Sequence, residues 1–173
     1  EKENTAGLRI DDPRRNYRDP NEKVEAAYAL TEFEHLNGIQ FAKEIAEYFR
    51  TVENPAAKEI VVRLEAFGQE AVAPLFKWVA QLADDEIAAL ARSTAAAARK
   101  MEGRHAHWIG WMGDHYPGDK GIVFAAFLRY DAVKPGQMFV NRAGVPHAHL
   151  QGTCIEVMEN SDNVVRCGIT PKN

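Results

Sequence analysis

The sequence predicts an α+β protein, in which a helical part is followed by a β-rich part. Two observations support this prediction. From residue 56 to about residue 112, apolar side chains recur at the spacing of one helix face. After the turn at 116–119, short apolar runs alternate with glycine, proline and asparagine, which is typical of strands and turns. Because the two patterns are segregated along the chain, we expect separate helical and β parts.

Composition restricts the class of protein. The 173 residues suffice for a hydrophobic core, and a net charge of −4 argues against nucleic acid as a partner. No apolar run approaches the roughly 20 residues of a membrane span, so we expect no membrane partner and a cytoplasmic location. The two cysteines, Cys154 and Cys167, are too few for a disulfide scaffold, and we expect buried free thiols. Nothing here indicates an oligomeric state.

The first 39 residues show little helical periodicity. Residues 1–28 are polar and rich in turn-forming residues, so we expect an irregular loop. A short helix is predicted from Thr31 to Gly38, with Thr31 as N-cap, Glu34 completing a capping box and Gly38 at its end. His35 and His115 are expected at the surface.

Several helices are predicted next. One covers residues 40–52, and Asn54-Pro55 starts another that ends at Gly68. A third follows over 72–82, and Asp84 is expected to cap a fourth. The three tryptophans, Trp78, Trp108 and Trp111, are expected in the core of this helical layer.

Strands are predicted from residue 121 onward. The run GIVFAAFLRYDAV (121–133) is continuously apolar over much of its length and indicates a strand buried on both faces. QMFV (137–140) indicates a second strand, and residues 141–172 a series of short ones. We therefore expect an N-terminal segment over 1–39, a helical domain over 40–115 and a β-rich part over 116–173.

Ionisable residues gather in the stretch 141–172. His147, Glu156, Asp162 and Arg166 lie between apolar β-branched residues, and alternate strand residues share one face of a sheet. A histidine, a carboxylate and an arginine that face one cavity can hold a metal and an anionic substrate. A hydrogen-bonded structural histidine is the alternative for His147, and packing is the expected role of His149.

A set of motifs resembles type I mannose-6-phosphate isomerases. In chain order the motifs are RNYRDPN, ALTEFEHLNG, YPGD, KPGQMF, VPHAHLQG, EVMENSDNVVR and ITPK. The resemblance implies cupin-like jelly rolls with a helical domain, a bound Zn²⁺, and interconversion of mannose 6-phosphate and fructose 6-phosphate, so the expected partner is a hexose 6-phosphate. It also implies that the chain corresponds to the middle portion of such enzymes, cut on both sides.

The resemblance assigns roles residue by residue. Glu25 and His147 match zinc ligands. Arg166 matches a catalytic arginine and Lys23 a lysine near the sugar, with Asp162 close to Arg166 in sequence as a third catalytic candidate. Lys172 and Glu156 are candidates for substrate binding.

The chain also departs from the family pattern. Where the family has Asn-His-Lys-Pro-Glu, this chain has Asn21-Glu22-Lys23-Val24-Glu25. The family's Gln-x-His motif, which supplies two further zinc ligands, is absent from residues 1–20. Three hypotheses therefore stay open: a zinc-dependent isomerase, an inactive cupin-like module that binds a sugar phosphate or metal, and a structural fragment.

Overall fold

The computed structural model describes residues 2–15, 19–161 and 163–169. The chain divides into two compact units, which are described separately. Glu1–His35 and Asp131–Val165 form one unit, here called the β unit. Leu36–Tyr130 and Arg166–Asn173 form the other, the helical unit. Two of the three boundaries between the units, after His35 and after Tyr130, fall within strands.

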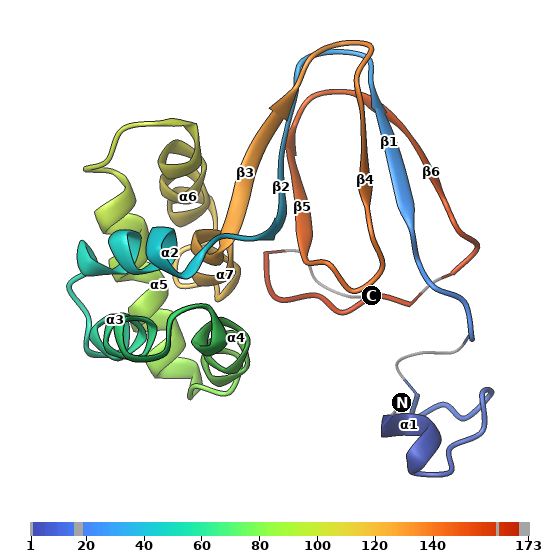
Figure 1. The fold of residues 1–173 in the computed structure, drawn as a ribbon, viewed down its shortest axis with the longest axis horizontal. Coiled ribbons are helices and arrows are strands. Elements are labelled where there is room, and N and C mark those ends of the chain that lie inside the picture. The colour runs from blue at the N-terminus through green and yellow to red at the C-terminus, as the bar shows by residue number, and fades with distance from the viewer. Residues whose placement is uncertain (1, 16–18, 162, 170–173) are drawn as a thin grey trace. The chain divides into compact units, whose positions relative to one another are not determined.

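The helical unit has the helices that the sequence predicts between residues 40 and 115 (Figure 1). The described elements are α2 (Ala42–Arg50), α3 (Pro55–Phe67), the 3-10 turn η1 (Gly68–Ala71), α4 (Val72–Val79), α5 (Asp84–Ala98), α6 (Arg104–His115) and α7 (Gly121–Phe127). Among the described residues, no helix is both long enough and apolar enough to cross a membrane.

Local signals explain several of these helix ends. The Asn54 side chain accepts a hydrogen bond from the backbone N–H of Ala56 at 2.8 Å, and Pro55 opens α3. Gly68, with φ of 56°, ends that helix. The predicted cap at Asp84 is wrong by one position: Ala83 is the N-cap, and its N–H donates to the Glu86 carboxylate at 3.2 Å.

The predicted strand over 121–133 is wrong in its first half. Residues Gly121–Phe127 form α7, and only Leu128–Val133 form a strand, β3. Every residue from Ile122 to Phe127 is at least 96% buried. A short run that is apolar on all sides has no periodicity, and therefore cannot distinguish a buried helix from a buried strand.

Aromatic side chains dominate the core of the helical unit. The rings of Phe49 and Phe127 lie 5.2 Å apart, and those of Phe76 and Phe124 4.6 Å apart. The expectation that all three tryptophans are core residues is only partly confirmed, because Trp108 is buried whereas Trp78 is half-buried and Trp111 exposed.

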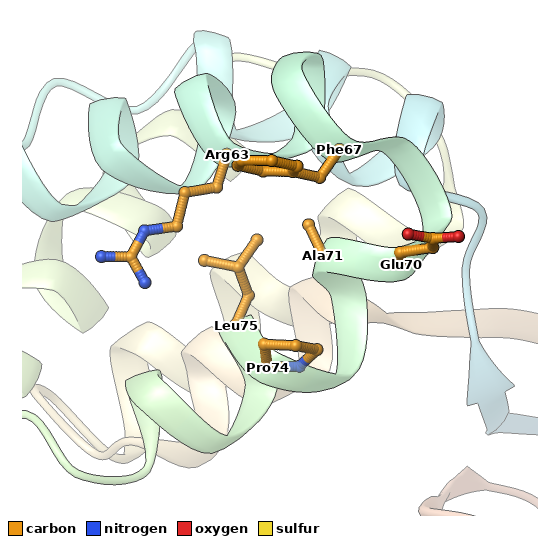
Figure 2. A pocket seen from close by; sticks show the side chains of 6 residues that line it. All are labelled: Arg63, Phe67, Glu70, Ala71, Pro74 and Leu75. Atoms are coloured by element: carbon orange, nitrogen blue, oxygen red, sulfur yellow. The ribbon is translucent and has the colours of Figure 1, made fainter.

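The helical unit also has a surface groove between α3 and α4 (Figure 2). Phe67, Ala71, Pro74 and Leu75 form its apolar lining, and Arg63 and Glu70 contribute the charged side chains. No predicted site residue lines it.

Two three-stranded sheets account for the β structure (Figure 1). The first has the order β4-β1-β6, from Met138–Asn141, Glu25–Ala29 and Cys154–Met158. Both pairings are antiparallel: Glu25 lies opposite Asn141 on one side and Met158 on the other. The second has the order β3-β2-β5, in which β2 is Phe33–Ile39 and β5 is His147–Gln151. The α+β class with a cupin-like β part and a helical part is confirmed.

Three predictions for the β unit are wrong. The segment Phe33–Ile39 is a strand and not a helix. The predicted helix was only eight residues long, and such a short helix is less stable than a strand that pairs on both sides, here with β3 and β5. The N-terminal 28 residues are not all irregular, since α1 (Lys2–Thr5) and most of β1 lie within them. Beyond Met158, the described residues form no further strand.

Burial corrects two further expectations. His35 is only 2% exposed and stacks on Phe139, with ring centroids 3.9 Å apart. His115 is exposed, as expected. Both cysteines are free, as predicted, but each is half-buried and not fully buried.

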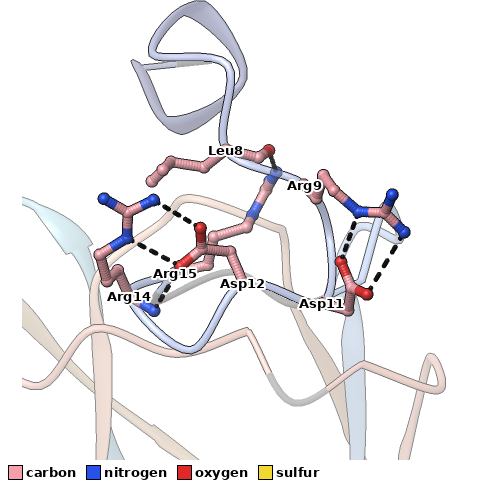
Figure 3. A network of polar contacts seen from close by, with 6 residues as sticks. All are labelled: Leu8, Arg9, Asp11, Asp12, Arg14 and Arg15. Carbon is pink, nitrogen blue, oxygen red and sulfur yellow. Dashed lines mark hydrogen bonds and ion pairs between the residues drawn. The ribbon is translucent and has the colours of Figure 1, made fainter.

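The N-terminal arginines pair with neighbouring aspartates (Figure 3). Arg9 contacts Asp11 at 3.1 Å, and Arg14 contacts Asp12 at 2.7 Å. Hydrogen bonds from the Arg14 side chain and backbone lower the pKa of Asp12 to about 2. Arg15 is buried and donates to the carbonyl of Leu8 at 2.8 Å. These contacts give the arginines a structural role.

Candidate metal centre

Glu25 is the first residue of β1, and its side chain lies on the inner face of the β4-β1-β6 sheet. Successive strand residues point to opposite faces, so Ala27 and Ala29 share this face with Glu25. All three are buried, and Glu25 is only 5% exposed. A buried carboxylate requires charged or hydrogen-bonding partners.

The two oxygens of Glu25 have different partners. Lys23 Nζ lies 2.8 Å from Oε1, and His147 Nε2 lies 2.8 Å from Oε2. His147 is the first residue of β5, 122 positions away in sequence, and its side chain is 29% exposed. The fold therefore brings together the two residues that the sequence suggested as zinc ligands, together with the candidate Lys23.

The second nitrogen of His147 determines the tautomer of the neutral ring. Nδ1 lies 3.0 Å from the backbone carbonyl of Val145, and a carbonyl only accepts, so Nδ1 is the donor. In the neutral ring Nε2 then has a lone pair, which points at a carboxylate oxygen. Two such groups face each other favourably only when a proton or a metal cation lies between them.

Electrostatics keeps Glu25 ionised. Burial raises the pKa of its carboxyl, but the hydrogen bond from Lys23 and the nearby His147 outweigh that effect, and the net pKa lies below its usual range. Asn141, directly opposite on β4, also favours the charged form. Among the described residues, the buried side-chain amide of Asn141 makes no hydrogen bond of standard geometry.

His149 lies beside this cluster. Its ring meets Phe33 and Phe139 edge-on, with centroids 5.1 and 5.9 Å away, which agrees with the expected packing role. Burial lowers its pKa. Its Nε2 lies 3.8 Å from Oε1 of Glu156, on strand β6 of the other sheet. Through this contact Glu156 adjoins the histidines.

The remaining predicted site residues belong to the other unit or lie outside the described residues. Arg166 is an exposed residue of the helical unit. Asp162 and Lys172 lie outside the described residues. Asn141 and His35 are buried polar residues that sequence reasoning did not single out for the site. Asn141 had one signal, because it is polar and ends an otherwise apolar strand.

The ligand atoms of Glu25 and His147 are suited to zinc, but they come from only two residues. An imidazole nitrogen and a carboxylate oxygen are both common zinc ligands. Within the described ranges, no group of three or more His, Cys, Asp and Glu side chains could hold a metal ion. A tetrahedral site normally needs at least three protein ligands, so Glu25 and His147 alone are fewer than such a site requires.

Known proteins resemble the chain over nearly all of its length. A mannose-6-phosphate isomerase from Salmonella typhimurium is 34% identical over 171 residues, which cover 99% of this chain and 44% of that protein. The human mannose-6-phosphate isomerase is 32% identical over 174 residues, covering 91% of this chain and 41% of the relative. No protein-family model matches.

Solved structures agree with the sequence comparison. A zinc-bound mannose 6-phosphate isomerase superposes with a TM-score of 0.81 at 34% identity, over 99% of this chain and 44% of the other. The Salmonella enzyme bound to fructose 6-phosphate and zinc gives a TM-score of 0.79 at 33% identity, with the same coverage. The chain spans less than half the length of these relatives, and over that span it is related in sequence and fold to the mannose-6-phosphate isomerases.

Proposed function

We propose that this chain contributes the zinc-binding part of an isomerase that interconverts mannose 6-phosphate and fructose 6-phosphate. The observation that supports this most is the arrangement of His147. Its Nδ1 is held by the Val145 carbonyl at 3.0 Å, and its Nε2 faces the buried Glu25 carboxylate at 2.8 Å. A backbone carbonyl that fixes the tautomer of a histidine is the usual second partner of a metal-ligating imidazole.

Glu25 and His147 are the residues that would hold zinc. When bound, zinc supplies a Lewis acid that stabilises negative charge on a substrate oxygen. Two ligand atoms of a tetrahedral zinc lie roughly 3.4 Å apart. The present separation of 2.8 Å between Nε2 and Oε2 is close to that value, so only small side-chain shifts are needed.

The reaction requires a proton to move between C2 and C1 of the sugar. Lys23 is a candidate for this step because it contacts a proposed ligand, with its Nζ 2.8 Å from Oε1 of Glu25. We assign catalytic roles to Lys23, Arg166 and Asp162, with Arg166 pairing with an oxyanion through its planar guanidinium group. Lys172 and Glu156 are the proposed substrate-binding residues.

A second candidate function is binding without turnover. Glu22 and Val24 replace the histidine and proline of the family segment, and these changes lie next to both Lys23 and Glu25. A module with these replacements would bind fructose 6-phosphate or zinc but would not isomerise the sugar.

Elemental analysis of the purified parent chain and two variants tests the proposal. The parent chain, His147→Ala and His115→Ala are each loaded with zinc, dialysed and analysed, and then assayed for isomerisation of mannose 6-phosphate. His115 is a matched control, because it is an exposed histidine of the helical unit. We expect about one zinc in the parent and in His115→Ala, and at least a tenfold loss of zinc affinity in His147→Ala.

The outcomes separate the candidates. Zinc retention together with isomerisation supports the enzyme. Zinc retention with binding of fructose 6-phosphate but no turnover supports the binding module. If neither the parent nor the control retains zinc, or if His147→Ala retains as much as the parent, the proposed metal centre is wrong.

A further inference from the structure

Two of the sequence motifs come into contact within the helical unit. YPGD ends at Asp119, just before α7, and ITPK begins at Ile169, 50 residues later. The Asp119 carboxylate joins the two, because its Oδ1 accepts hydrogen bonds from the backbone N–H groups of Gly121 at 2.7 Å and Ile169 at 2.9 Å. Asp119, Ile169 and the candidate Arg166 all belong to this unit, so the contact lies within one compact body.

The backbone of residues 168–169 lies directly against the start of α7. A Cβ atom on Gly168 would clash with Asp119 Oδ1 and would lie 2.5 Å from the backbone nitrogen of Gly121. A Cβ atom on Gly121 would lie 2.6 Å from Cγ1 of Ile169. Glycine is therefore needed on both sides of the contact, because only residues without a side chain let the two backbones approach this closely.

Ile169 has an unfavourable backbone conformation. Its φ is 66°, and no other non-glycine residue in the described part of the chain has a positive φ. A β-branched residue is strongly disfavoured in this region, so the surrounding contacts must hold it there. The hydrogen bond from the Ile169 N–H to Asp119 acts on the strained residue directly. Backbone strain of this kind is concentrated at functional sites.

The strained residue lies close in sequence to Arg166. Gly168 and Ile169 follow Arg166 by two and three positions, and Cys167 and Gly168 between them are half-buried. The backbone that leads from the Asp119 contact to Arg166 is therefore short and packed. A guanidinium group stabilises an oxyanion effectively only when its planar fork is aligned, so the position of this backbone matters for its chemistry.

We propose that Asp119 is a positioning residue for Arg166. Its carboxylate holds the backbone of residues 168–169 against α7, and this fixes the segment from which the Arg166 side chain extends. The catalytic role of Arg166 rests on the proposed function, whereas the anchoring of its backbone does not. The alternative is a local role, in which Asp119 only satisfies a free N–H group at the start of α7. The bond to Ile169 favours positioning, because it satisfies no group of that helix.

NMR of labelled chains tests the anchoring without any activity. Asp119→Ala removes the acceptor oxygen, and Asp119→Asn keeps one. Asp114→Ala is the matched control, because Asp114 is an exposed aspartate of the same unit that pairs with Arg99. In Asp119→Ala we expect hydrogen exchange of the Ile169 amide to accelerate about tenfold, and the backbone order parameter of Arg166 to fall from about 0.85 to below about 0.6. Asp119→Asn and Asp114→Ala should resemble the parent.

A second variant reaches the same contact from the other side. Gly168→Ala keeps the Asp119 carboxylate but places a Cβ atom between the two backbones. We expect it to lower the order of Arg166 as Asp119→Ala does, with an unchanged far-UV spectrum. It therefore keeps the proposal testable if Asp119→Ala does not fold.

Kinetics separates positioning from a local role. Isomerisation of mannose 6-phosphate by the zinc-loaded chain is compared for the parent, Asp119→Ala, Arg166→Ala and the double variant. We expect Asp119→Ala to lower kcat by about 10- to 100-fold with little change in KM, and Asp119→Asn to restore it. In the Arg166→Ala background, Asp119→Ala should cause no further loss, because its effect passes through Arg166.

The outcomes distinguish this inference from the proposed function. Unchanged Ile169 exchange and Arg166 order in Asp119→Ala would overturn the inference, whatever the activity. A loss of kcat that is equally large in the Arg166→Ala background would also overturn it and leave Asp119 with a local role. If the NMR changes occur but the parent does not isomerise the sugar, the positioning of Arg166 is supported and the proposed function is wrong.

Discussion

The two units of this chain differ in the polarity of their buried residues. In the helical unit the buried side chains are almost all apolar, and Thr94 is its one buried polar residue within the described ranges. In the β unit, the described buried apolar residues are only Ala27, Ala29 and Phe33. Its buried polar residues are more numerous: Arg15, Glu25, Glu34, His35, Asn141 and Ser161.

Buried apolar and buried polar residues contribute differently to a protein. Apolar burial stabilises a fold in proportion to area, whereas buried polar groups stabilise it only when each finds a partner. The helical unit has the larger apolar core, and the β unit has the paired ionisable groups Lys23, Glu25 and His147. We therefore expect substitutions in the two units to affect different measurements.

The largest expected effect is in the helical core. Phe127 is fully buried between Phe49 and Phe76, so Phe127→Ala should lower the free energy of unfolding by about 3–5 kcal/mol. All three tryptophans lie in this unit, and their fluorescence during urea unfolding measures the change. Phe67→Ala is the control, because Phe67 is 67% exposed, and it should change the free energy by less than about 0.5 kcal/mol. Equal losses in both variants would contradict the proposed core.

A smaller, local effect is expected at Glu25. Glu25→Gln removes the charge that Lys23 and His147 both contact, and should destabilise β1 by about 1–2 kcal/mol, since both partners are partly exposed. Hydrogen exchange of the β1 amides should accelerate about tenfold, while the tryptophan-detected transition stays unchanged.

Glu65→Gln is the matched control for Glu25. Glu65 pairs with Arg50 at 2.7 Å, but both side chains are about half exposed. Surface pairs of this kind contribute less than about 1 kcal/mol, so neither measurement should change appreciably. If Glu25→Gln shifted the tryptophan transition as strongly as it accelerates β1 exchange, the two units would not be energetically separate.

The helical unit was the easier one to predict from sequence. Periodicity and punctuation, such as Asn54-Pro55 and Gly68, are local signals that a helix satisfies without help from distant residues. The exceptions have a physical reason. Residues 121–127 are buried on all sides and have no amphipathic pattern, and residues 33–39 form a strand only because β3 and β5 pair with it.

The site could be predicted only in part. Motif resemblance suggested Glu25, Lys23 and His147, and the fold places them in contact. Asn141 and His35 were missed as buried polar residues, since their burial depends on sheet pairing and on stacking with Phe139. Those contacts are non-local, so no sequence spacing encodes them.

The smallest expected effect is a pH dependence of the helical unit. Burial lowers the pKa of His105, and its Nε2 donates to the carbonyl of Ala125 at 2.9 Å. The unfolded chain therefore binds a proton at a higher pH than the folded one, and stability falls as the pH drops through the unfolded value of 6.5. We expect the free energy of unfolding to fall as the pH drops from about 7.5 to about 5.5. His105→Gln keeps a donor for Ala125 and should flatten this slope, whereas the exposed His115→Gln should retain it. Tryptophan-detected unfolding at several pH values measures the slopes. A His105→Gln slope as steep as that of the parent would show that other groups cause the pH dependence.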